Sequence, residues 1–537
     1  MRSMKSCTLR RISALLLALL LAAPAALADD LASDLGGGYV AADPNAAPPT
    51  EVDMTFADVV IGYIEPGFAE ISPVRCTEWD MISINQLVYE PVVDMDDSMK
   101  PIPMLADNWE QDGKYWKFNL RSGIQFHNGL ELTAYDVVAS YQAILASGSA
   151  NPYYARLSMI KEMQAMDVYT VIVKARNSSL LTLYAMNFPV MQYETVNDQI
   201  PRGTGPYWYI QYDPDGTIRL EANPLWWKKQ PGVQSILLRR YDTPGDAIEA
   251  IQTRQISMLS TKSPKASFSR KLADLTSLDY PTLTYEMLVP NLSSSSIMSD
   301  INVRKAVMYA IDRSLLAANA YLDMTIQSEV PVVPNCWLYE SQSAIYYYSP
   351  ERALQMMNNS GWIDLTGDGV LKKKNGIMLQ EPRIQIITYN ESTNSIREKA
   401  VYMIKDYLEA IGITVSVSVL SRDKVRDRIK HREYDLALIG VNLSEIPEIS
   451  SVVGTDGSLN YNYYSDNLMD MYITAAHSAT NEETLLKAYS DIQLTIADQL
   501  PILGLVFRTG TVLSSRPIGG LSGLRAYDNF NGFEFLK

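Results

Sequence analysis

Three histidines are the side chains of this 537-residue chain best suited to acid–base catalysis or metal binding. His127 lies in an FHNG turn at residues 126–129, whereas His431 and His477 lie on charged or helical segments without ligand spacing. A catalytic triad would need a nucleophile and a carboxylate beside the imidazole, and nothing near His127 supplies them. We therefore expect His127 to tie the turn together, because both ring nitrogens can bond backbone groups.

Other segments that could carry chemistry also favour structural roles. Residues 364–369 (DLTGDG) begin like a calcium loop, but Asn375 occupies the twelfth position, where an EF-hand needs glutamate. This segment predicts a surface hairpin turn. The chain has no GxSxG, no HExxH and no SxxK with its companion motifs. We expect no catalytic residue, no metal site and no cofactor.

The elements around His127 follow from local patterns. Residues 116–120 alternate apolar and polar side chains like a half-buried strand, and residues 124–126 could resume it. Asn128-Gly129 predicts a turn. Thr133 is a candidate N-cap, with Asp136 in a capping-box relation. An apolar stripe then predicts a helix, with Val137, Val138, Tyr141, Ile144 and Leu145 on its buried face.

Short strands and helices alternate along the rest of the chain, which indicates an α/β or α+β fold. Runs rich in β-branched residues predict strands at 57–64, 170–175, 234–241, 382–389, 413–420 and 435–441. Apolar spacings of three and four predict helices at 303–322, 394–412 and 482–499.

The N-terminus reads as a secretory signal peptide. Four basic residues precede an apolar run at 14–23, and Ala26-Leu27-Ala28 gives a small-residue cleavage site. Cys7 is too far upstream for a lipoprotein signal. We expect residues 1–28 to be removed, residues 29–53 to form a flexible leader, and the exported protein to be soluble.

Charge and size limit the partners and the architecture. Loss of the leader peptide removes four positive charges and no negative ones, so 42 Lys and Arg face 61 Asp and Glu, a net charge of −19. Such a surface disfavours nucleic acid. The remaining length of about 509 residues calls for two or more lobes. Cys76 and Cys336 allow one disulfide or two free thiols.

Several motifs, taken in their order along the chain, resemble those of the family 5 solute-binding proteins of ABC importers, which include oligopeptide, dipeptide and nickel-chelate binders. Besides the FHNG turn and the TAYDVV helix start at 133–138, the chain carries similar motifs from about residue 57 to 510. They are LADNW at 105–109, GTGPY at 203–207, NP with WW at 223–227, VRKA with YAIDR at 303–313, IGI at 411–413 and YDL at 434–436.

The resemblance implies a two-lobe, periplasmic-binding-protein-like clamp of type II, cluster C, with an extra small domain. Lobe I would comprise residues 54–88, 197–282 and 498–537. The small domain II would span 89–196, and lobe II, or domain III, 283–497. The implied protein is an exported, monomeric component that captures a peptide or peptide-like solute by hinge closure. It would deliver that solute to membrane permease and ATPase subunits.

The chain departs from the peptide-binding pattern after the YDL strand. Val441 stands where tryptophan is usual, and Ser444 stands where an aspartate pairs with the peptide amine. Glu445 could replace that aspartate, although a shift of one residue on an extended chain reverses the side chain's direction. These positions, with Asn442 between them, are candidate ligand contacts.

Further candidate contacts are aromatic or polar residues at positions where the family contributes to the cleft, or tyrosines clustered in one segment. They are Trp79, Asp80, Cys336, Trp337, Tyr389, Asn390, Tyr461 and Tyr463. Packing beneath a surface loop is the structural alternative for the tyrosines. The sequence leaves open a non-peptide ligand such as a sugar, metal chelate or small metabolite, and a role as a ligand-loaded sensor. A secreted hydrolase is disfavoured by the missing motifs.

Overall fold

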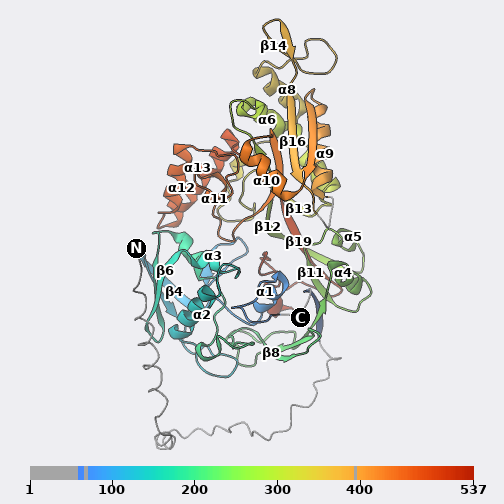
Figure 1. Ribbon diagram of the computed structural model, residues 1–537. Coiled ribbons are helices and arrows are strands. Elements are labelled where there is room, and N and C mark those ends of the chain that lie inside the picture. Colours follow the sequence, from blue (N-terminus) through green and yellow to red (C-terminus); the bar gives the residue numbers. More distant parts are fainter. Residues whose placement is uncertain (1–57, 66–69, 392–395, 537) are drawn as a thin grey trace, which may run out of the picture. The chain divides into compact units, whose positions relative to one another are not determined.

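The computed structural model of the chain describes residues 58–65, 70–391 and 396–536 (Figure 1). The predicted signal peptide and leader lie outside these residues. Within the described part of the chain, no helix is both long and apolar enough to span a membrane.

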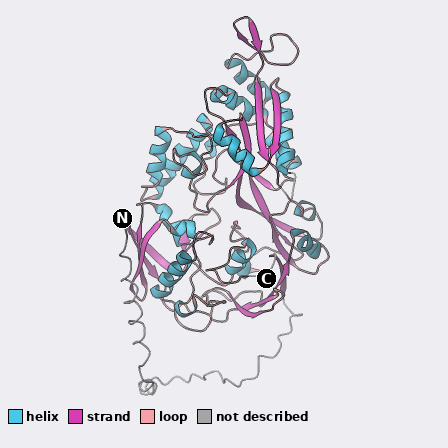
Figure 2. Cartoon of the chain, in the orientation of Figure 1, coloured by secondary structure: helices cyan, strands magenta, loops and turns pink. Residues whose placement is uncertain are grey.

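Helices and strands are mixed, as predicted (Figure 2). The described residues build one eleven-stranded sheet. Its order is β17-β16-β18-β12-β19-β11-β1-β10-β9-β8, with β13 paired to β19. The bounds are β1 Val59–Ile64, β8 Tyr207–Tyr212, β9 Ile218–Ala222, β10 Ser235–Tyr241, β11 Met258–Thr261, β12 Thr276–Pro290, β13 Thr325–Gln327, β16 Arg383–Tyr389, β17 Thr414–Leu420, β18 Leu436–Asn442 and β19 Leu503–Ser514. The strands predicted at 57–64, 234–241, 382–389, 413–420 and 435–441 are confirmed.

Strands β12 and β19 join the two ends of this sheet. They run antiparallel to each other, and their register shifts between Pro281 and Tyr285. Strands β18, β16 and β17 lie beyond β12, while β11, β1, β10, β9 and β8 lie beyond β19. Because β12 also pairs with β18 through Thr284 and Asn442, the loop after β18 starts beside the shifted part of β12.

The smaller sheets lie elsewhere in the chain. Four strands form the order β4-β5-β7-β6, with β4 Ala106–Asp112, β5 Tyr115–Leu120, β6 Ile160–Asp167 and β7 Thr170–Ala175. Two hairpins pair β2 Val93–Met95 with β3 Pro101–Pro103, and β14 Lys373–Asn375 with β15 Met378–Gln380. The four-stranded sheet falls inside residues 89–196, whose assignment as a domain stays a prediction.

The helices flank these sheets. They are α1 Trp79–Asn85, α2 Ala134–Ser147, α3 Tyr154–Leu157, α4 Pro244–Gln252, α5 Ala266–Ser269, α6 Ile301–Ala310, α7 Arg313–Asn319, α8 Pro350–Asn359, α9 Ile396–Glu409, α10 Arg422–His431, α11 Ser450–Val453, α12 Asn467–Ala476 and α13 Glu482–Gln499. Short 3₁₀ turns include η1 Leu180–Met186. Helix α13 is confirmed, as is the part of the predicted 394–412 helix within the described residues.

The single helix predicted over 303–322 is wrong, because the segment forms α6 and α7. Ile311 between them has an extended backbone, and the Asp312 side chain accepts a bond from the Leu315 amide at 2.9 Å. Aspartate is a favoured N-cap, so it starts a new helix rather than continuing the old one.

The FHNG segment has the predicted strand, turn and capped helix. Trp116, Phe118 and Leu120 are buried on β5. Both bonds of the Thr133–Asp136 capping box are present at the start of α2. Residues 124–126 do not resume the strand, since the segment contributes only a bridge between Gln125 and Glu131.

His127 joins this turn to the GTGPY segment. Its Nδ1 accepts the Gly203 amide at 3.3 Å, and Nε2 lies 3.4 Å from the Gly205 carbonyl oxygen. Burial lowers the pKa of His127 to about 4, which keeps the ring neutral. The structural role predicted for His127 is confirmed.

Buried Glu90 connects other motifs shared with the family. Its carboxylate accepts bonds from the indoles of Trp226 at 3.0 Å and Trp227 at 2.9 Å, and from the Thr204 hydroxyl at 2.8 Å. Burial raises the pKa of Glu90, although these donors and Lys228 oppose the rise. The motifs at 203–207 and 223–227 therefore meet around one carboxyl group.

Candidate functional site

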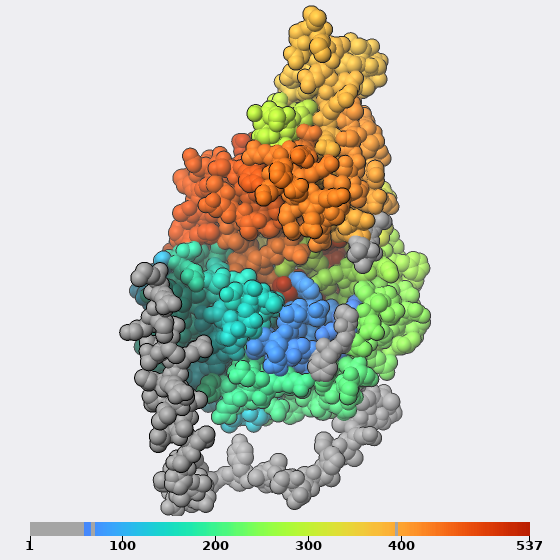
Figure 3. All heavy atoms as spheres, viewed as in Figure 1, coloured from blue at the N-terminus to red at the C-terminus, as the bar shows by residue number. Residues whose placement is uncertain are grey.

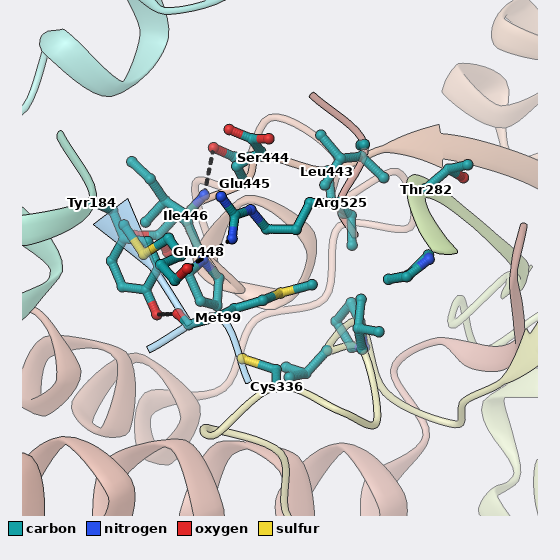
Figure 4. A pocket seen from close by; sticks show the side chains of 18 of the residues that line it. Met99, Tyr184, Thr282, Cys336, Leu443, Ser444, Glu445, Ile446, Glu448 and Arg525 are labelled. Carbon is teal, nitrogen blue, oxygen red and sulfur yellow. Dashed lines mark hydrogen bonds between the residues drawn. The ribbon is translucent and has the colours of Figure 1, made fainter. Parts of the chain in front are cut away.

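A pocket lies where several distant segments of the chain meet (Figure 4). About 780 Å³ of space lies between the protein atoms there, and part of it is open solvent. Its walls come from Met95 and Met99, Arg156, Tyr184 and Asn187, Pro281 to Leu283, Pro331 to Val333 with Cys336, Leu443 to Glu448, Phe507, and Arg525 with Ala526.

The main sheet places three of these walls. Pro281 to Leu283 lie at the register shift of β12, Phe507 lies on β19, and Leu443 to Glu448 follow β18. Much of the lining is apolar, so the pocket can hold an aliphatic or aromatic group of a ligand. The apolar side chains are Met95, Met99, Leu283, Val332, Val333, Leu443, Ile446 and Phe507.

One ion pair forms the most prominent charged feature of the lining. The Arg156 guanidinium donates to Glu445 Oε2, with side chains 6% and 17% exposed. Arg156 also donates to the carbonyl and side-chain oxygens of Asn187 at 2.7 and 3.1 Å. The other carboxylate oxygen of Glu445 has no hydrogen bond among the described residues, so it can accept one from a ligand.

A second charged group lies beside this pair. Arg525 donates to the Met95 carbonyl at 3.0 Å, to Asp94 at 3.3 Å and to Asp528 at 2.9 Å. Burial alone would lower the pKa of Arg525, but Asp528, Asp94 and Glu445 raise it. Burial raises the pKa of Asp528 to about 7 against the effect of Arg525. In Figure 4, Glu445 and Arg525 border the same space.

Glu448 and Tyr184 complete the polar lining. The Glu448 carboxylate lies 2.7 Å from His477 Nε2 and accepts the Ser450 amide at 2.8 Å. Its bond to Glu448 raises the pKa of His477. The Tyr184 hydroxyl donates to the Met99 carbonyl at 2.9 Å and accepts the Trp337 indole N–H at 2.8 Å.

Three of the predicted contact residues line this pocket, namely Cys336, Ser444 and Glu445. Trp337 lies behind the wall through its bond to Tyr184. Val441 is buried on β18, and the Asn442 side chain accepts the Thr284 hydroxyl at 2.9 Å instead of facing the pocket. Cys336 and Cys76 are both buried free thiols, so the predicted alternative of two unpaired cysteines holds.

Trp79 and Asp80 do not line the pocket but lie near its charged edge. The Trp79 ring stacks on Tyr527 with centroids 3.8 Å apart, and Lys262 Nζ lies 3.3 Å from the Trp79 centroid. Burial lowers the pKa of Lys262 to about 7, while the charges of Asp80 and Glu445 oppose that change. Lys262 therefore lies close enough to Asp80 and Glu445 for both carboxylates to act on its charge.

The remaining predicted contacts lie outside the pocket. Tyr389 is buried, and the guanidinium groups of Arg397 and Arg422 lie 4.2 and 4.7 Å from its ring centroid. Asn390 is exposed at the end of β16. Tyr461 is half-buried against the core, and Tyr463 is 54% exposed. Their roles as ligand contacts stay predictions.

Sequence reasoning missed Arg156 and Arg525. Arg156 lies on a four-residue helix without a motif, and Arg525 lies beyond the last motif shared with the family. A carboxylate without an obvious partner, Glu445, was the one signal that a buried cation should exist nearby.

Residues 364–369, which begin like a calcium loop, form a surface turn as predicted. The Asp364 carboxylate accepts the amides of Thr366, Gly367 and Gly369, so its oxygens are already bonded to the backbone. Across the residues that the structure describes, no group of three or more His, Cys, Asp or Glu side chains is arranged to hold a metal ion.

Comparisons with known proteins define the class of protein. The family described as bacterial extracellular solute-binding proteins, family 5 (middle), matches residues 100–462. This match covers more than half of the chain, which therefore belongs to that family.

Particular relatives cover most of the chain. It is 22% identical to the oligopeptide-binding protein AppA of Bacillus subtilis over 469 residues, covering 83% of this chain and 85% of AppA. It is 22% identical to the dipeptide-binding protein of Escherichia coli, covering 75% and 80%. The solved structure of a nickel ABC transporter protein from Bacillus halodurans matches with a TM-score of 0.73 at 19% identity, covering 85% and 94%.

Proposed function

We propose that this chain is the extracytoplasmic solute-binding component of an ABC importer and that it captures a peptide or peptide-like solute. Family membership supports the general role, and relatives named as oligopeptide- and dipeptide-binding proteins support the solute class. The observation that carries the ligand assignment is the Arg156–Glu445 pair inside a largely apolar pocket.

The pair favours a ligand that carries both charges. The free oxygen of Glu445 can accept a ligand ammonium while Oε2 keeps its bond to Arg156, and the guanidinium can then attract a ligand carboxylate as well. A zwitterion can bond Glu445 through its ammonium and Arg156 through its carboxylate. A short peptide supplies both groups together with apolar side chains for the walls.

The pair also joins segments that we propose belong to different domains. Arg156 lies in residues 89–196, proposed as domain II, and Glu445 lies in residues 283–497, proposed as lobe II. Residues 54–88, 197–282 and 498–537 would form lobe I. A ligand that contacts both segments would favour the closed arrangement, which permease and ATPase subunits would then recognise.

We further propose that the protein is exported by residues 1–28, acts as a monomer and leaves its ligand chemically unchanged. The extracellular family assignment agrees with export. Incubation of the protein with a peptide, followed by mass spectrometry of the recovered peptide, tests the last point. Recovery of the intact peptide is expected, and cleavage products would contradict a pure binding role.

Calorimetric titration of ligand-free protein tests the solute class. Short peptides with free termini should bind, whereas N-acetylated and C-amidated versions should each bind roughly tenfold more weakly or worse, the equivalent of about 1.4 kcal/mol. Equal affinity for the blocked and free peptides would contradict the zwitterion argument. Binding of a nickel chelate or sugar, with none of any peptide, would contradict the proposed solute class.

A further inference from the structure

The β14–β15 hairpin stands out from the protein around it. Figure 1 shows it beyond the end of α8, and Figure 3 shows the same segment projecting from the surface. All residues from 373 to 380 are exposed, on both faces of the hairpin. Nothing in the described chain therefore covers either face.

This exposed hairpin has an apolar strand. Ile377, Met378 and Leu379 are 103%, 70% and 46% exposed. Ile363 and Leu365, in the loop that leads to the hairpin, are 46% and 43% exposed. Single exposed apolar residues are common on surfaces, but a cluster on a projecting hairpin marks an interaction site.

The opposite strand is basic. Lys373 and Lys374 are exposed, and Lys374 pairs with Leu379 across the hairpin. Lys373 donates to the Ser360 carbonyl at 2.8 Å, whereas Lys374 has no hydrogen bond or ion pair within the described residues. Lys372, at the base, is already paired with Asp368. The ammonium of Lys374 is thus available for an external anion.

We propose that this hairpin binds an anionic lipid surface, with its apolar side chains in the interface and its lysines at the headgroups. Interfacial anchors combine apolar side chains with lysines in this way, and lysine stems can lie along apolar surface while their charges reach phosphate. The chain from residue 29 onward has 42 Lys and Arg against 61 Asp and Glu, and this net charge of −19 repels an anionic membrane, so approach requires a local basic site.

The shape of the site favours lipid over a protein partner. Each strand of the hairpin is only three residues long, a small face beside the roughly 800 Å² per partner that a stable protein interface covers, whereas insertion into a lipid surface needs only a few projecting apolar side chains. Helix α10 is another basic surface, but its apolar residues Val425 and Ile429 are buried, so it offers nothing to insert. The hairpin has both exposed lysines and exposed apolar side chains.

Flotation with lipid vesicles tests the proposal. The chain from residue 29 onward is used, because the apolar run at 14–23 would itself bind lipid. Protein should float with vesicles of phosphatidylglycerol and phosphatidylcholine and much less with phosphatidylcholine alone. Combined replacement of Ile377, Met378 and Leu379 by serine should reduce binding roughly tenfold or more. Lys374→Gln should reduce it roughly fivefold.

A matched control replaces three exposed apolar residues elsewhere, Leu468, Met471 and Leu486, by serine. This variant should bind vesicles like the unchanged protein, and thermal unfolding should show that all variants fold. Absence of vesicle binding, or binding that the hairpin substitutions leave unchanged, would overturn the proposal. Unchanged peptide affinity in the hairpin variants would separate this surface from the ligand pocket.

Discussion

Arg156 and Glu445 show how far single residues could be predicted. Glu445 was a candidate because it follows β18, where the family places an acidic partner for a peptide amine. Its partner Arg156 lies 289 positions away in the sequence, and no local pattern links the two. Pairing across such a separation depends on the fold, so the acidic half of the site was predictable and the basic half was not.

Replacement of Glu445 by glutamine should weaken peptide binding about 10- to 100-fold. The substitution removes the acceptor for the ligand ammonium and leaves Arg156 without its charged partner. Calorimetric titration with a free-terminus peptide measures the change. The loss should shrink for an N-acetylated peptide, because that ligand has no ammonium to pair.

Glu482→Gln is the matched control. Glu482 pairs with Lys100 at 2.7 Å, and its side chain is more exposed than that of Glu445. This ion pair also joins residues 89–196 to residues 283–497, but it lies outside the pocket. Peptide affinity should stay the same in this variant. Equal effects of the two substitutions would remove Glu445 from the ligand site.

His127→Asn should lower the free energy of unfolding without changing ligand affinity. The variant loses bonds to Gly203 and Gly205, at a cost of about 1–3 kcal/mol for buried backbone groups. The pKa of His127 is depressed to about 4 in the folded state, below its ordinary value of 6.5. Its contribution to stability is therefore present above pH 6.5 and is lost as pH falls toward 4.

Chemical denaturation at several pH values measures both effects. The variant should lose less stability than the unchanged protein between pH 6.5 and 4. His431→Asn is the control, since His431 is exposed beside Asp427. Weakened ligand binding at unchanged stability would instead give His127 a functional role.

At the scale of elements, strands were predicted better than helix ends. β-branched runs bounded by turn residues identify buried strands, because side chains must fit a pleated, packed surface. The 303–322 segment keeps helical spacing throughout, yet Asp312 caps a second helix within it. A cap competes with helix continuation locally, and periodicity alone does not reveal the outcome.

Gly440→Ala should destabilise β18 and disturb the pocket loop that follows it. An added Cβ would lie 2.5 Å from Arg397 Nη2 and 2.8 Å from Glu286 Oε1, which form a buried ion pair. Overpacking of this kind costs about 1–3 kcal/mol. Denaturation should show that loss, and titration should show weaker peptide binding.

Gly519→Ala is the control at this scale, because no atom lies within 4 Å of its added Cβ. Stability and binding should both stay the same. A stable Gly440→Ala variant with normal affinity would mean that the position of β18 does not control the pocket.

At the scale of the whole molecule, ordered motifs predicted the family and the α/β clamp, but not the pocket. Its walls are brought together by the order of the large sheet, in which β12 and β19 connect strands from both ends of the chain. Local patterns identify elements, whereas convergence of residues 95 to 526 depends on how those elements pair. Trp79, Tyr389 and Tyr461 therefore had plausible side chains at positions outside the pocket.

Native mass spectrometry of the protein recovered from its own cells tests the central claim most directly. Bound ligand adds its mass to that of the protein, and dissociation in the instrument releases it for sequencing. We expect a ladder of short peptides with free termini, and the Glu445→Gln variant should retain markedly less of it than Glu482→Gln. Recovery of a sugar, a metal chelate or a single non-zwitterionic metabolite in place of peptides would contradict the proposed function.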